Sequence, residues 1–155
     1  MNYATPSSTS LPQGFIPVML TPFLKSGAVD YVGLRALTDF YLEAGATGLF
    51  ANCLSSEMFE LSEQERLDVT QTVVDQVAGR VPVVATGTFP GSVAEQAAFV
   101  KRIYDTGVQA VIVITGLMAE ETETDEVFTN RVLELISLTD GIPWDCMSVR
   151  SLIKG

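Results

Sequence analysis

Histidine is absent from all 155 residues of this chain, and cysteine occurs only at Cys53 and Cys146. The lack of histidine removes the usual catalytic acid and base, the commonest zinc ligand and every Ser-His or Cys-His relay. The two cysteines show no metal-ligand spacing, and we interpret Cys53 as a small, semi-buried residue rather than a reactive thiol. We therefore expect no metal and no cofactor. Any chemistry must use lysine, tyrosine, carboxylates, hydroxyls or backbone groups.

Positive charge is also scarce, because nine Lys and Arg residues face nineteen Asp and Glu residues, for a net charge of −10. Such a surface repels phosphate backbones and anionic lipid, so we expect neither nucleic acid nor membranes as partners. The longest apolar stretch, Val108–Ala119, is too short to span a bilayer. The polar first residues lack the basic and apolar regions of a signal peptide. We expect a cytoplasmic protein with a flexible tail over residues 1–13.

Apolar runs and amphipathic helical patterns alternate four times along the rest of the chain. The repeat of about thirty residues is the size of one strand-plus-helix unit of a parallel sheet. Four units are half of a (β/α)8 TIM barrel, which needs roughly 250 residues. We therefore predict an α/β fold, a half-barrel with parallel strands over residues 14–143. The expected strands are Phe15–Leu20, Gly48–Ala51, Val81–Ala85 and Ala110–Ile114.

Capping residues predict where the helices begin. The pairs Ser62/Glu65 and Ser92/Glu95 each form a capping box, in which side chain and backbone amide bond reciprocally. Another helix is expected from about Asp30, and a fourth over about 125–138. Residues 141–143 resemble the approach to a fifth strand. Residues 144–155 show neither strand nor helix periodicity, so we interpret them as an aberrant tail.

The carboxyl ends of parallel barrel strands are where active sites form, so the loops after the apolar runs are the candidate sites. Thr21, Thr86 and Thr115 begin three of these loops. In the loop after the second run, the adjacent hydroxyls of Ser55 and Ser56, with their amides, could bind a small carboxylate. On spacing alone, a serine-rich turn with local side-chain to backbone bonds is the more probable interpretation.

Several short sequence stretches, which together cover most of residues 14–143, match those of a known protein family in the same order. The chain resembles the dihydrodipicolinate synthase / N-acetylneuraminate lyase family of pyruvate-dependent class I aldolases. The matching stretches are 14–23, 29–30, 43–45, 49–57, 61–66, 78–83 and 107–114. No single stretch decides the match, but their order and spacing make it fairly specific.

The resemblance implies a small 2-oxo acid substrate such as pyruvate, bound as an imine to a lysine on the sixth barrel strand. It also implies a proton-relaying tyrosine on the fifth strand and a Gly-Thr/Ser-Thr-Gly-Glu loop that holds the substrate carboxylate. That loop maps to residues 53–57, where Ser55 falls on the carboxylate-binding hydroxyl and Leu54 on the hydroxyl that meets the tyrosine. Cys53 and Ser56 replace the two glycines, which indicates a divergent branch. The expected substrate-binding residues are Ser55, Ser56 and Thr21.

Neither catalytic residue of that family has a counterpart in this chain. Its three lysines fall in polar or surface positions, and its four tyrosines fall in the tail or in helices. Where the family often has Pro-Tyr-Tyr after the fourth strand, this chain has Gly-Leu-Met at 116–118, so no tyrosine for a neighbouring subunit is expected. The catalytic set is therefore expected to be empty and the isolated chain inactive. The residues concerned are Lys25, Lys101, Lys154, Tyr3, Tyr31, Tyr41 and Tyr104.

One set of codons for residues 144–155, read in a shifted frame, gives Gly-Leu-Tyr-Glu-Cys-Pro-Val-Pro-Tyr-Lys-Arg, which resembles the family's fifth strand. We interpret the tail as the product of a frameshift that truncated a family member. Three functions stay open on the sequence. The chain could be the N-terminal half of a class I aldolase or lyase, or a non-catalytic half-barrel that self-associates through open strand edges or pairs with an intact homologue. A small-anion binding module around Ser55 and Ser56 is the third.

Overall fold

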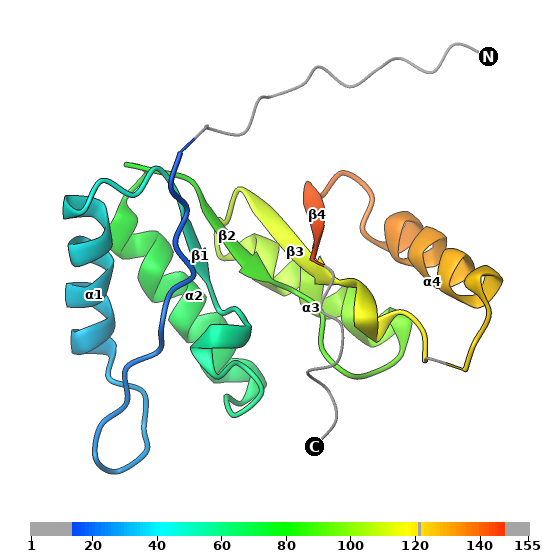
Figure 1. Ribbon diagram of the computed structural model, residues 1–155, viewed down its shortest axis with the longest axis horizontal. Coiled ribbons are helices and arrows are strands. Elements are labelled where there is room, and N and C mark those ends of the chain that lie inside the picture. The colour runs from blue at the N-terminus through cyan, green and yellow to red at the C-terminus, as the bar shows by residue number, and fades with distance from the viewer. Residues whose placement is uncertain (1–13, 121, 148–155) are drawn as a thin grey trace.

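Strands and helices alternate along the chain. The structure, a computed structural model, describes residues 14–120 and 122–147. Within these residues it contains four strands, four α-helices and two short 3-10 helices (Figure 1). In chain order they are α1 (Tyr31–Glu43), β1 (Leu49–Ala51), η1 (Leu54–Ser56), α2 (Glu63–Val77), β2 (Val83–Thr86), α3 (Val93–Asp105), β3 (Ala110–Ile114), η2 (Thr115–Leu117), α4 (Asp125–Leu138) and β4 (Trp144–Met147).

The four strands form one parallel sheet in the order β1-β2-β3-β4, so each strand pairs with the next one in the chain. The register aligns Ala51 with Ala85, Ala85 with Val111, and Val113 with Cys146. A helix carries the chain from one strand to the next, as parallel pairing requires. The predicted α/β fold with parallel strands is confirmed.

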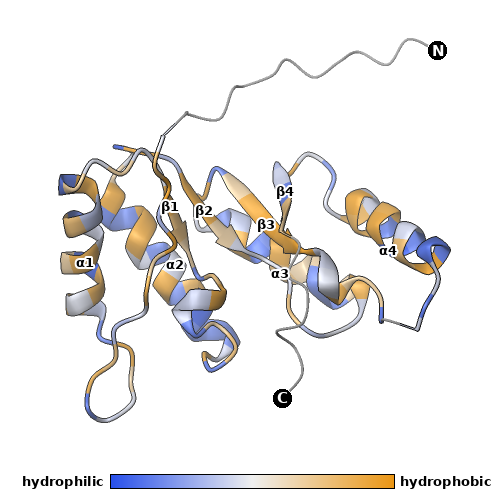
Figure 2. Ribbon diagram, in the orientation of Figure 1, coloured by the Kyte–Doolittle hydropathy of each residue, from blue (hydrophilic) through white to orange (hydrophobic). Residues whose placement is uncertain are grey.

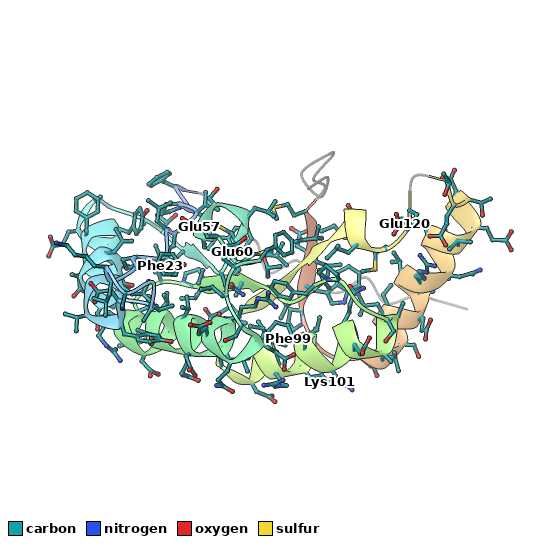
Figure 3. The ribbon with its side chains drawn as sticks, turned by 90° about the horizontal axis from the view of Figure 1, so that it is seen from below. Phe23, Glu57, Glu60, Phe99, Lys101 and Glu120 are labelled. Atoms are coloured by element: carbon teal, nitrogen blue, oxygen red, sulfur yellow. The ribbon has the colours of Figure 1, made fainter. Side chains whose placement is uncertain are left out.

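Helices α2 and α3 lie on one side of this sheet, and α1 and α4 stand at opposite ends of the molecule (Figure 3). Helices α2 and α3 contact the strands, while α1 packs beside α2 and α4 beside α3. Successive side chains of a strand point to opposite faces, and every second one faces these helices. Those side chains are at most 2 % exposed and form the centre of the core. They are Leu49, Ala51, Val83, Ala85, Val111 and Val113.

The opposite face of the sheet has no helix against it in the described part of the chain. Val18, Phe50, Val84 and Ala110 lie in one row across it, since each is the register partner of the next. Val18 is 46 % exposed and the other three are partly exposed. Strands β1 to β3 are predominantly hydrophobic along their length (Figure 2). The sheet therefore presents an uncovered apolar face.

The helix starts follow the predicted caps. The amide of Ser62 donates to Glu65 Oε2 at 2.8 Å, and the amide of Glu65 donates to Ser62 Oγ at 3.3 Å. Ser92 and Glu95 repeat the same box at the start of α3. Asp30 caps α1, and α4 covers the range expected for it. Caps of this kind satisfy amides that the first helical turn leaves free.

The expected strand over residues 15–20 is wrong as a regular strand. This segment is extended and runs alongside β1, but only Val18 forms a bridge, with Phe50. Phe50 donates to the carbonyl of Pro17 and accepts from the amide of Met19. The preceding parallel position would need an amide hydrogen on residue 17, which proline lacks, so the ladder stops there.

Residues 144–147 also correct the sequence analysis, which expected no strand there. They form β4, parallel to β3, with Val111 opposite Trp144 and Ile114 opposite Met147. Pairing with the buried strand β3 makes residues 144–147 a strand, although their sequence does not alternate between apolar and polar residues. The rest of the expected tail, 148–155, and the expected flexible segment, 1–13, lie outside the described residues. Among those described, no helix has the length and apolar character needed to cross a membrane.

Candidate functional site

The strand ends meet at one edge of the sheet, because parallel strands all point their carboxyl ends the same way. Four segments follow these ends: Thr21 onward, the loop 52–60 with η1, residues 87–91, and η2. This edge is where binding sites form in parallel α/β folds. It is therefore the candidate site.

Side-chain hydrogen bonds join each neighbouring pair of strand ends at this edge. They bridge, in turn, the extended segment and β1, then β1 and β2, β2 and β3, and β3 and β4. The four bonds run from Ser56 Oγ to Met19 O (2.6 Å), from Asn52 Nδ2 to Thr86 O (3.4 Å), from Ile114 N to Thr88 Oγ1 (2.8 Å) and from Thr115 Oγ1 to Met147 O (3.3 Å). The loops thus rest on a connected support, which suits a site that must hold its shape.

The loop after β1 has an unusual backbone. Asn52 and Glu57, at either end of residues 53–56, adopt left-handed conformations with φ of 49° and 56°. Such φ values cost non-glycine residues about 1 kcal/mol or more and persist where the surroundings fix them. Between them, η1 turns the chain back tightly. The strain at both ends is held in place by contacts within the loop.

Three hydrogen-bond donors of η1 have no protein partner among residues 14–120 and 122–147. They are the amides of Leu54 and Ser55 and the hydroxyl of Ser55, whose side chain is exposed. The third amide of η1, that of Ser56, donates to Cys53 O, and the following amide of Glu57 donates to Leu54 O. Adjacent free donors of this kind can hold a carboxylate by charge-assisted hydrogen bonds.

The structure places the three predicted binding residues differently. Ser55 is exposed on the loop, whereas Ser56 is 1 % exposed and turns its hydroxyl inward to Met19. Thr21 is 8 % exposed, and its hydroxyl oxygen is buried without a protein partner. Ser55 and Ser56 therefore share one loop, but only Ser55 presents its hydroxyl. Substrate contacts by any of the three stay predictions.

The described lysines and Tyr31, which were expected to be non-catalytic, are not part of the loop 52–60. Lys101 lies on the outer side of α3, across the molecule from Glu57 (Figure 3). Lys25 is exposed in the loop before α1, and Tyr31 belongs to α1. Burial, with smaller contributions from nearby Asp68 and Glu65, raises the pKa of Tyr31, so its phenol stays protonated at neutral pH. Lys154 and Tyr3 lie outside the described residues.

The surroundings of the loop are acidic rather than metal-binding. Glu57 and Glu60 are exposed near one another (Figure 3). No group of three His, Cys, Asp or Glu residues suited to a metal ion occurs in the part of the chain that the structure describes. The loop therefore relies on backbone and hydroxyl donors, and its own carboxylates work against a strongly charged anion.

Sequence reasoning missed two residues that shape this edge. Asn52 is 1 % exposed, and its carboxamide bonds across to β2 while Oδ1 stays without a protein partner. Thr88 supplies the oxygen that receives the amide of Ile114. A signal existed for Asn52, since asparagine is among the few residues other than glycine that adopt a left-handed conformation readily. Thr88 gave no such signal, because its partner lies 26 residues away.

Comparison with known proteins fits this geometry. The profile described as the Dihydrodipicolinate synthetase family matches residues 11–127. The chain belongs to this family. A 4-hydroxy-tetrahydrodipicolinate synthase from Methanococcus maripaludis is 39 % identical over 111 residues, covering 72 % of this chain and 38 % of that protein. An L-2-keto-3-deoxyarabonate dehydratase from Azospirillum brasilense is 39 % identical over 82 residues, covering 53 % and 26 %.

Solved structures of family members share the fold. Dihydrodipicolinate synthase from Acinetobacter baumannii, crystallised with pyruvate, superimposes with a TM-score of 0.79 at 26 % identity, covering 88 % of this chain and 46 % of that one. The chain therefore spans about two fifths of the length of the curated relatives it matches, and rather less than half of this structure. The four strands and four helices match part of a family TIM barrel.

Proposed function

We propose that this chain forms the carboxylate-holding part of a class I aldolase or lyase that acts on pyruvate or a related 2-oxo acid. In this proposal the loop 53–57 binds the carboxylate of the 2-oxo acid. The chain does not itself carry out the imine chemistry, because no lysine of its described part stands at a strand end. Membership of the family supports the reaction class.

The observation that carries the proposal is the set of free donors on the loop. The amides of Leu54 and Ser55 and the hydroxyl of Ser55 lie next to each other in sequence, at the carboxyl edge of the sheet, with no protein acceptor in the described residues. A carboxylate offers two oxygens and matches such a set. A family member crystallised with pyruvate supports this class of ligand.

A titration with pyruvate tests the binding step. In a two-dimensional amide NMR spectrum, added pyruvate is expected to shift the Leu54 and Ser55 signals first. Ser55→Ala removes one donor and is expected to weaken binding about tenfold, as loss of one hydrogen bond to a charged group does. Ser137→Ala, an exposed serine of α4, is the matched control and should bind as the unchanged chain does. Unchanged loop signals at saturating pyruvate would contradict the proposal.

Borohydride trapping tests the absence of imine chemistry. Incubation of the chain with pyruvate and borohydride, followed by mass spectrometry, is expected to show no covalent adduct. Exposed lysines keep their charge and are poor nucleophiles at neutral pH. An adduct on Lys25 or Lys101 would overturn this part of the proposal.

A second candidate function rests on the uncovered sheet face and the free strand edges. As the alternative to the aldolase or lyase function, we propose that the chain is a non-catalytic half-barrel that self-associates or pairs with an intact homologue. Besides the row described above, Phe15, Ile16 and Leu20 are 60 %, 40 % and 55 % exposed. Uncovered apolar faces and free edges favour association. Light scattering across a concentration series is expected to show assemblies larger than 16.7 kDa, and a monomer at every concentration would count against it.

A further inference from the structure

We infer that Cys53 and Ser56 act together as positioning residues that hold the carboxylate loop in the conformation that presents its free donors. We refer to this pair and its bonds to Met19 as the loop latch. The inference rests on the proposed function for the meaning of the loop. The latch itself rests on contacts that the structure shows directly.

Two backbone groups fill two of the three hydrogen-bonding positions of the Ser56 hydroxyl. Its hydroxyl donates to Met19 O at 2.6 Å and accepts from the amide of Cys53 at 3.0 Å. A serine hydroxyl has one hydrogen and two acceptor positions, so one acceptor position is left. The residue is 1 % exposed, so water does not fill that position from the surface.

The thiol of Cys53 takes the remaining position. Its Sγ lies 3.1 Å from Ser56 Oγ and 3.7 Å from Met19 O, and the residue is 1 % exposed. Because the hydroxyl hydrogen of Ser56 goes to Met19, the thiol is the donor between the two side chains. The hydroxyl of Ser56 therefore donates to Met19 O of the neighbouring extended segment, and the thiol of Cys53 supports it from beside that carbonyl.

The latch lies between the two residues of the loop that have left-handed backbone conformations. Asn52 and Glu57, the two left-handed residues, flank the segment 53–56 whose ends the latch joins. With the hydroxyl of Ser56 fixed inward, Ser55 must face the other way, toward solvent. Cys53 and Ser56 are also the two positions at which the loop departs from the glycines of the family motif. The departures thus contact each other instead of being independent changes.

Thiol reactivity offers a direct test, because Cys146 is exposed and Cys53 is buried. In Cys146→Ser, the thiol of Cys53 is the only one left, and its reaction with a disulfide reagent reports opening of the latch. Adding Ser56→Ala is expected to raise the reaction rate at least tenfold. Adding Ser92→Ala instead weakens a helix cap elsewhere and serves as the control. Equal acceleration in both variants, at matched loss of Tm, would overturn the latch.

Two replacements of Cys53 distinguish a hydrogen-bonding role of its thiol from a space-filling role. Cys53→Ser keeps a donor at this place, whereas Cys53→Ala removes it. We expect Cys53→Ala to raise amide hydrogen exchange of residues 55–57 about tenfold and Cys53→Ser to restore most of the protection, with β2 and β3 unchanged. If the two variants exchange alike, the thiol is only filling space and the inference fails.

Pyruvate binding then distinguishes the inference from the proposed function. If the unchanged chain binds pyruvate, Ser56→Ala is expected to weaken binding about tenfold although Ser56 offers no free donor. An unchanged Kd would contradict the positioning role. If the unchanged chain binds no pyruvate at all, the proposed function fails. The thiol and exchange measurements still decide whether the latch exists.

Discussion

The Oγ1 atom of Thr88 accepts a hydrogen bond of 2.8 Å from the backbone amide of Ile114, so a side chain joins the ends of β2 and β3. Both residues are fully buried. Thr88→Val keeps the shape but removes the acceptor. We expect a loss of about 1–3 kcal/mol in the free energy of unfolding, the cost of an unsatisfied buried amide. Urea unfolding measures it.

Thr129→Val is the control for this substitution. Thr129 also hydrogen-bonds to the backbone, in this case donating to Asp125 O, but it lies exposed on α4. Its loss is expected to change stability by less than about 0.5 kcal/mol. Equal losses in the free energy of unfolding for the two substitutions would show that the hydrogen bond of Thr88 contributes no more to stability than an exposed one.

Gly87 has no room for a side chain. A Cβ there would lie 2.3 Å from Val111 Cγ1 and 3.2 Å from Val100 Cγ2. Gly87→Ala is expected to cost about 1–3 kcal/mol by overpacking. Adding Val111→Ala removes the nearest clash, so the double variant should be more stable than the sum of the two single losses predicts. Simple additivity in urea unfolding would contradict this explanation.

The capping box of α2 predicts a pH dependence. Hydrogen bonds from the side chain and amide of Ser62 lower the pKa of Glu65. The unfolded pKa is near 4.3, so the folded pKa lies below that value. The stability that the ionised Glu65 adds to the fold is therefore complete above the pKa that Glu65 has in the unfolded chain. It is lost as the pH falls through the pKa of Glu65 in the folded chain.

An NMR titration of the Glu65 carboxyl carbon measures this shift. In Ser62→Ala the pKa of Glu65 is expected to rise toward its ordinary value, because its main cause has been removed. Glu95 is an internal control, since its pKa is lowered by Ser92 in the same way and should not respond. A Glu65 pKa that does not move would show that the box does not hold in solution.

Arg131 forms a fork on Glu123, with distances of 2.6 and 2.8 Å, and also donates to Met118 O at 3.1 Å. The hydrogen bond from Arg131 lowers the pKa of Glu123. Lysine cannot make the two parallel bonds. Arg131→Lys is expected to lower the free energy of unfolding only slightly, since the pair is partly exposed, and to raise the pKa of Glu123. Arg35→Lys on the exposed face of α1 should leave both quantities unchanged.

Local signals were sufficient for the helices and for the central strand. The serine–glutamate boxes fix the first residues of α2 and α3, because the bonds concerned span three residues. The apolar run 110–114 became β3 without change, since a strand buried between two neighbours is apolar throughout. Ser55 could be located on its loop because the apolar run that becomes β1 ends at Ala51, four residues before it.

Contacts between residues far apart in the sequence determine the features that could not be predicted from the sequence. The segment Trp144–Met147 shows no alternation of apolar and polar residues, and it becomes a strand through pairing with β3. Conversely, residues 15–20 look like a strand, but Pro17 cannot supply the donor that the ladder needs. The inward turn of Ser56 depends on Met19, 37 residues earlier, so no local pattern separates it from Ser55. The frameshift interpretation and the proposed domain limits stay predictions.

The neighbour-to-neighbour order of the strands has a consequence for synthesis on the ribosome. Because each strand pairs with the one made just before it, no pairing in this sheet has to wait for distant sequence to emerge. Each pairing joins residues 26 to 34 positions apart, because a helix lies between paired strands, and domains begin to fold from their amino ends during translation. The sheet can therefore grow one strand and one helix at a time, and each step buries the apolar side of the helix just completed.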